Sequence, residues 1–139
     1  MNAPLYTTEI LRLAASLPAP EHLEHVDGRA ARRSPTCGSS LLAEVQMKDG
    51  RIEALSQTVL SCAFGQASAA LVAREAVGRT RSEVEAALGQ LSGWLSGQSG
   101  DSPGWPGFEA LSPARPRTGR HGAILLPLRA LLAAIDSAQ

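Results

Sequence analysis

The chain of 139 residues is long enough for one compact domain, and its 44% hydrophobic content is enough for a sizeable core. Its 13 basic and 13 acidic residues cancel, which argues against a general affinity for nucleic acid or for an acidic membrane surface. No apolar run approaches the roughly 18 residues of a membrane-spanning helix, and the first residues lack the pattern of a signal peptide. We therefore expect one cytoplasmic domain over residues 1–139, with both cysteines reduced.

The first third of the chain predicts a helix and then a strand. Apolar side chains recur at helical spacing over residues 5–17, and Pro18 and Pro20 end the pattern. The following polar stretch, residues 21–36, has room for a short edge strand that ends at Pro35.

Two alternating segments, residues 40–48 and 51–60, predict a β-hairpin. Asp49 and Gly50 join them, and this dipeptide is typical of a type I′ turn because both central residues need positive φ.

The period then changes to that of helices. Residues 62–77 are rich in alanine and precede Gly78, a residue typical of a helix C-terminus. Thr80 and Glu83 fit a capping box, and an apolar stripe follows over residues 84–95.

The last third predicts a loop, a turn and a final helix. Residues 97–107 form a loop rich in glycine and proline, and residues 108–111 fit one helical turn. Residues 112–120 read as an extended basic segment, in which Arg115, Arg117 and Arg120 are interpreted as solvated, with a docking surface for a partner as the alternative. The final helix covers residues 121–135, where Pro127 marks either a kink or the true start.

Three side chains stand out as soft or borderline metal ligands: Cys37, Cys62 and His121. Cys62 begins a predicted helix, where free N–H groups favour the thiolate form. The bare pattern leaves other roles open, because Cys62 also fits core packing, or a nucleophile with His121 as base. No acidic residue that would orient such a base is apparent. His22 and His25 are interpreted as solvated.

Two segments resemble the NifU/IscU/SufU type of iron–sulfur cluster assembly scaffold. SPTCG, around Cys37, is similar to the family's Asn-Pro-x-Cys-Gly-Asp. SCAFGQASA, around Cys62, is similar to its Gly-Cys-(Ala/Gly)-x-Ser-x-Ala-Ser at a helix start. The similarity extends from about residue 5 to residue 135 and includes VGRT before the helix SEVEAAL.

The resemblance implies an α+β fold of SufE/NifU-like architecture, with about three antiparallel strands and helices on one face. It also implies that Cys37, Cys62 and His121 bind the cofactor, since His121 lies where the family has a histidine or its third cysteine. Ser39 stands where the family has an aspartate and is a candidate fourth ligand, whereas Gly122 takes the place of a cysteine.

The function implied is a non-catalytic scaffold or carrier for iron or a [2Fe–2S] cluster. The partners implied are a cysteine desulfurase and cluster acceptor proteins, and the expected state is a monomer or weak homodimer without nucleic acid or membrane. Two alternatives remain open: a zinc-binding sulfur acceptor of the SufU kind, and a degenerate member without cluster chemistry, because Ser39 and Gly122 depart from the family.

Overall fold

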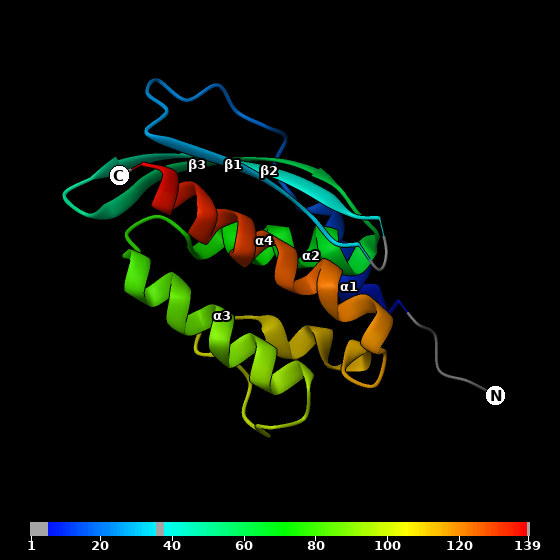
Figure 1. Cartoon of the computed structure of the whole chain (residues 1–139). Helices are drawn as coiled ribbons and strands as arrows, with labels where there is room; N and C mark the ends of the chain where they lie inside the picture. Colours follow the sequence, from blue (N-terminus) through cyan, green and yellow to red (C-terminus); the bar gives the residue numbers. More distant parts are fainter. Residues whose placement is uncertain (1–5, 36–37, 139) are drawn as a thin grey trace.

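A computed structural model describes residues 6–35 and 38–138 of the chain. The elements in chain order are α1 (Thr8–Ala15), β1 (Gly28–Arg33), β2 (Ser40–Lys48), β3 (Arg51–Leu60), α2 (Ala63–Glu75), α3 (Arg81–Leu95), the 3₁₀ helix η1 (Phe108–Ala114) and α4 (Thr118–Ser137). In these ranges the strands form one antiparallel sheet in the order β1-β2-β3. The helices cover one face of that sheet (Figure 1), so the predicted α+β fold is confirmed.

The predicted hairpin is present. Asp49 and Gly50 have φ values of 53° and 76°, the two positive angles that a type I′ turn requires. Lys48 then pairs with Arg51, and the ladder continues to the end of β3 with one irregularity after Gln46. The edge strand β1 is also confirmed, although it ends at Arg33, slightly before the predicted Pro35.

The core lies between the sheet and two layers of helices. The helix α4 packs across β1 and β2, and α2 packs along β3, while α1 and α3 pack on these two helices. Fully buried side chains such as Phe64, Leu71, Ile124 and Leu128 fill the centre. On the opposite face of the sheet, the described part of the chain places the coil that follows α1 (Figure 1). This coil is fixed there where the N–H of Glu21 donates to Ser56 Oγ at 2.8 Å.

Capping residues set the helix boundaries as the sequence predicts. Thr80 is the N-cap of α3, and its hydroxyl accepts the N–H of Glu83 at 3.2 Å. Gly78 has a φ of 91°, a left-handed conformation that suits glycine just beyond a helix.

The segment before the last helix, residues 112–120, is not the extended stretch that the sequence predicts. The helix η1 continues through Pro113 to Ala114, and α4 already begins at Thr118 and runs unbroken past Pro127. Burial of Ala114 favours the compact form, and Pro127 removes only one N–H of a long helix. Arg115 is not solvated either, because its Nε donates to the Trp94 carbonyl at 2.9 Å.

Across the described ranges, 6–35 and 38–138, we find no helix that combines the length and apolarity needed to span a membrane.

Candidate metal centre

Cys62 occupies the N-cap of α2, two residues after β3 ends. Its backbone is extended, with φ −68° and ψ 173°, and its side chain makes no capping hydrogen bond. The thiol is free and half-buried. The Cys62 side chain therefore does not cap the first N–H groups of α2, which lie at the end of the helix that favours negative charge.

The loop between β1 and β2 carries the other cysteine. Cys37 and its neighbour at position 36 lie outside the described residues, so the structure does not place that thiol. The residues on either side are closely tied, because Gly38 donates its N–H to the Ser34 carbonyl at 3.0 Å and Ser34 donates its own to the Ser39 carbonyl at 2.8 Å. The two sides of the loop, Ser34 on one and Gly38 and Ser39 on the other, are therefore held together.

The end of this loop at Ser39 lies beside the residue that precedes Cys62. The Oγ atoms of Ser39 and Ser61 are 2.9 Å apart, and Ser61 directly precedes Cys62. Ser39 is 3% exposed, so this hydroxyl pair is largely removed from water. The contact therefore connects Ser39, at the end of the loop between β1 and β2, with the residue next to Cys62. It also gives the Ser39 hydroxyl a protein partner. Ser39 would have to break this contact in order to bind a metal.

Gly65 allows the three chain segments to meet. A Cβ atom at this position in the first turn of α2 would lie 1.8 Å from Ser61 Oγ and 3.3 Å from the Ala123 carbonyl oxygen of α4. The side chain of Ser61 thus fills the space that a side chain at position 65 would need. The pairing of Ser61 with Gly65 was not predicted, although the sequence indicates it. The family motif has glycine directly before the cysteine and serine three residues after it, whereas here Ser61 precedes Cys62 and Gly65 follows it.

His121 lies in the first turn of α4 and is half-buried. Its Nε2 is 3.1 Å from the Ala114 carbonyl oxygen and 2.9 Å from that of Arg115. Carbonyl oxygens only accept hydrogen bonds, so Nε2 must carry the proton. The neutral ring then keeps its lone pair on Nδ1, which is the nitrogen available to a metal.

Within the described part of the chain, no three His, Cys, Asp or Glu side chains form a group that could hold a metal ion. Two of the three main predicted ligands, Cys62 and His121, belong to that part, whereas Cys37 does not. The convergence of the three side chains therefore stays a prediction. His22 and His25 are exposed, as expected, and His25 contacts the Asp27 carboxylate at 2.9 Å.

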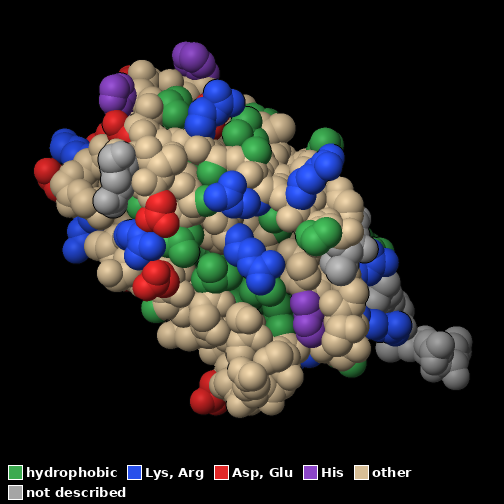
Figure 2. Space-filling view, in the orientation of Figure 1, with side chains coloured by type: hydrophobic (Ala, Val, Ile, Leu, Met, Phe, Trp, Pro, Cys, Tyr) green, Lys and Arg blue, Asp and Glu red, His purple; other side chains and the backbone are tan. Residues whose placement is uncertain are grey.

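The surface around these segments is basic. Arg32 and Arg33 end β1, and Arg117 and Arg120 flank the start of α4. Figure 2 shows Lys and Arg side chains over the middle and the right of this face, where α4 begins, and the acidic side chains mainly toward its left. A cluster bound by thiolates carries negative charge, so this distribution suits such a cargo.

Comparison with known proteins supports the predicted resemblance. No protein-family model matches the sequence, and no curated protein is significantly similar to it. Among solved structures, a NifU-like protein (N-terminal) from Brucella abortus is 28% identical with a TM-score of 0.90, over 96% of this chain and 94% of that chain.

A second structure shares the fold at lower identity. It is a proposed iron–sulfur cluster assembly scaffold protein for the SUF system from Fervidobacterium islandicum, 18% identical with a TM-score of 0.78, over 94% of this chain and 96% of that chain. The NifU-like domain, which shares the fold and 28% of its residues along nearly the whole chain, confirms the predicted resemblance to the NifU/IscU/SufU type.

Proposed function

We propose that this protein is a scaffold or carrier in iron–sulfur cluster assembly, and that residues 1–139 act as one domain. Its cargo would be iron or a [2Fe–2S] cluster, held by Cys37, Cys62 and His121. The observation that carries the proposal is the free thiol of Cys62 at the start of α2, beside the loop that carries Cys37, in the fold of a NifU-like domain.

The donor set fits such a cargo. Thiolates and imidazoles are the ligands that iron–sulfur clusters and zinc take from proteins. His121 would use Nδ1, because its Nε2 is occupied by two carbonyl oxygens. Three donors leave a fourth position for Ser39 or for an exogenous ligand. Ser39 would have to give up its contact with Ser61, so we expect it to contribute less than the other three.

The chain itself would perform no chemistry beyond holding its cargo. A cysteine desulfurase would deliver the sulfur and an acceptor protein would remove the finished cluster. The N–H groups at the start of α2 and the arginines near the start of α4 would stabilise the charge of the bound cluster. The cytoplasmic location stays a prediction.

The test is anaerobic reconstitution with ferrous iron and sulfide, followed by visible absorption and by analysis of iron and acid-labile sulfide. We expect charge-transfer bands and comparable iron and sulfide in the wild type, and a large loss of both in C37A and C62A. H121A should also lose cargo, whereas H25A is the matched control because His25 is an exposed histidine that is 72% solvent-accessible at its side chain. Cargo that survives both cysteine substitutions would contradict the proposal.

The same donors fit a zinc-binding sulfur acceptor, because two thiolates and an imidazole leave a fourth zinc position open. Metal analysis of protein purified from cells supplied with both metals distinguishes the two roles. Stoichiometric zinc, together with a persulfide on one cysteine detected by mass spectrometry, would favour sulfur acceptance over cluster scaffolding.

A further inference from the structure

Three contacts fix the guanidinium of Arg115, the residue that directly follows η1. Its Nε donates to the Trp94 carbonyl at 2.9 Å, and its Nη2 donates to the Ser99 carbonyl at 3.1 Å. Its Cζ also lies 5.0 Å from the centroid of the Trp94 ring, a distance at which an aromatic face attracts a cation. Trp94 is buried near the end of α3. The side chain of Arg115 therefore connects the end of η1 with α3 and with the loop after α3.

The backbone at the same place contacts the ring of His121. The Nε2 of His121 lies 2.9 Å from the carbonyl oxygen of Arg115 and 3.1 Å from that of Ala114. Ala114 is fully buried, so close packing holds its carbonyl group in place. Arg115 is only half-buried, so its position depends more on the contacts of its side chain. Arg115 thus contacts α3 through its guanidinium and His121 through its carbonyl oxygen.

The hydrogen bonds of Nε2 decide which nitrogen of His121 is available to a metal. A neutral imidazole has one N–H and one lone pair, and two carbonyl oxygens at Nε2 require the N–H there. Loss of the hydrogen bond that orients a ligating histidine lowers metal affinity about 10–100-fold in proteins. The next residue is Gly122, which has no side chain to bind a metal in place of His121.

We propose that Arg115 is a positioning residue for His121. Its guanidinium holds the turn between η1 and α4 against Trp94, and the carbonyl oxygens of that turn keep the proton of His121 on Nε2. Nδ1 then stays available to the metal of the cargo. The inference rests on the proposed scaffold function, because it takes His121 as a ligand. It adds that metal binding at Nδ1 depends on a side chain that does not touch the metal.

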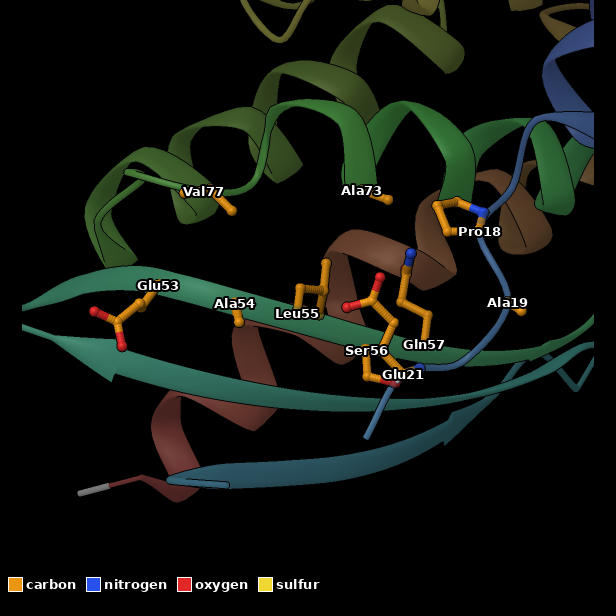
Figure 3. Close-up of a pocket in the computed structure, with 10 residues that line it drawn as sticks. All are labelled: Pro18, Ala19, Glu21, Glu53, Ala54, Leu55, Ser56, Gln57, Ala73 and Val77. Carbon is orange, nitrogen blue, oxygen red and sulfur yellow. Dashed lines mark hydrogen bonds between the residues drawn. The ribbon is translucent and has the colours of Figure 1, made fainter. Parts of the chain in front are cut away.

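Two other positions provide matched controls. Arg117 is exposed near the same turn, and its side chain has no hydrogen bond or ion pair with another described residue. R117A therefore removes the same charge as R115A without removing the contacts with α3. Figure 3 shows Glu53 on β3, at the wall of a cavity whose lining includes no residue of η1, α3 or α4. E53Q changes the charge at that remote place.

The first test uses the metal-free protein with ¹⁵N-labelled histidine, studied by NMR under mildly alkaline conditions, where an ordinary imidazole is neutral. We expect a proton signal on Nε2 of His121 that exchanges slowly with water, because two carbonyl oxygens accept it. H121A assigns this signal. R115A should lose it, whereas R117A and E53Q should keep it. R115K, which retains a donor but not the planar fork, should restore the signal in part.

The second test measures the affinity for Zn²⁺ alone, by competition with a chromophoric chelator. Loss of a positive charge favours the binding of a cation, so charge and positioning predict opposite effects for R115A. We expect R115A to bind zinc about 10–100-fold more weakly than the wild type, R117A to bind it as tightly or slightly more tightly, and R115K to lie between R115A and the wild type.

The outcomes separate this inference from the function on which it rests. If H121A binds zinc as tightly as the wild type, His121 is not a ligand, and both the proposed donor set and the positioning role fail. If H121A loses affinity but R115A binds zinc as R117A does, or keeps the Nε2 proton signal, the donor set stands and the positioning role of Arg115 is refuted.

Discussion

Replacement of Gly65 by alanine tests how tightly the start of α2 is built. The added Cβ would lie 1.8 Å from Ser61 Oγ and 2.7 Å from Ser61 Cβ, both far inside the 3.4 Å of an ordinary contact. Rotation of Ser61 would move its hydroxyl and break the 2.9 Å contact with Ser39, but it would not move Cβ. The backbone must therefore shift as well.

The expected cost follows from these contacts. Overpacking of this kind destabilises proteins by about 1–3 kcal/mol, and loss of the Ser39–Ser61 hydrogen bond adds about 1 kcal/mol. The higher helix propensity of alanine returns up to about 1 kcal/mol. We expect G65A to lower the free energy of unfolding by about 2 kcal/mol, which corresponds to roughly 4–8 °C in Tm for a chain of this size.

The assay is urea unfolding of the metal-free protein followed by circular dichroism, for a double-mutant cycle of G65A and S61G. Because S61G removes both clashing atoms, the double variant should be more stable than the sum of the single effects by about 2 kcal/mol. G89A is the matched control, since a Cβ at this exposed helical glycine meets nothing within 4 Å, and it should be neutral or stabilising. Additivity of the two substitutions within about 0.5 kcal/mol would refute the reasoning.

Three further predictions concern the packing of α4 and of the loop before η1. G28A should lower the free energy of unfolding by about 1–3 kcal/mol in urea, because its Cβ would lie 2.0 Å from the Ala134 carbonyl oxygen; a neutral result would contradict this packing of β1 on α4. Arg81 lowers the pKa of Asp136 below its ordinary 3.8, chiefly through a hydrogen bond, so this pair contributes stability above that pH and loses it on further acidification. D136N should therefore be less stable than the wild type at neutral pH and converge with it in acid, as measured by urea midpoints at several pH values; a constant difference would count against the pair. W105F should lose about 1–2 kcal/mol and expose residues 97–107 to protease, because the indole N–H donates to a backbone carbonyl of α2 at 3.0 Å; unchanged cleavage would show that this bond does not hold the loop.

Short-range patterns gave the most accurate expectations about the fold. The hairpin at Asp49 and Gly50 and the cap at Thr80 depend on the backbone preferences of a few neighbouring residues, so the sequence contains all that is needed. The prediction of an extended segment over residues 112–120 was wrong. It followed from the two prolines, which locally disfavour a helix. Burial of Ala114, which no local pattern reveals, decided in favour of the helical form.

The candidate site shows the same division. The sequence indicated that Cys62 begins a helix, and the structure has it at the N-cap of α2. The contact between Ser39 and Ser61 joins residues 22 positions apart, and the hydrogen bond from Gln57 to the Ala69 carbonyl joins residues 12 positions apart. Only tertiary folding brings these residues together. Arg115 is likewise not solvated, because its guanidinium lies over the Trp94 ring at 5.0 Å from the centroid, a contact between residues 21 positions apart that the sequence pattern does not reveal.

X-ray absorption at the edge of the metal bound after reconstitution tests the central claim most directly. We expect a sulfur shell near 2.3 Å and a nitrogen contribution near 2.0 Å, with sulfur from protein thiolates reduced in C37A and again in C62A, and the nitrogen lost in H121A. A metal coordinated only by oxygen and nitrogen, or a sulfur shell unchanged when both cysteines are replaced, would contradict the account.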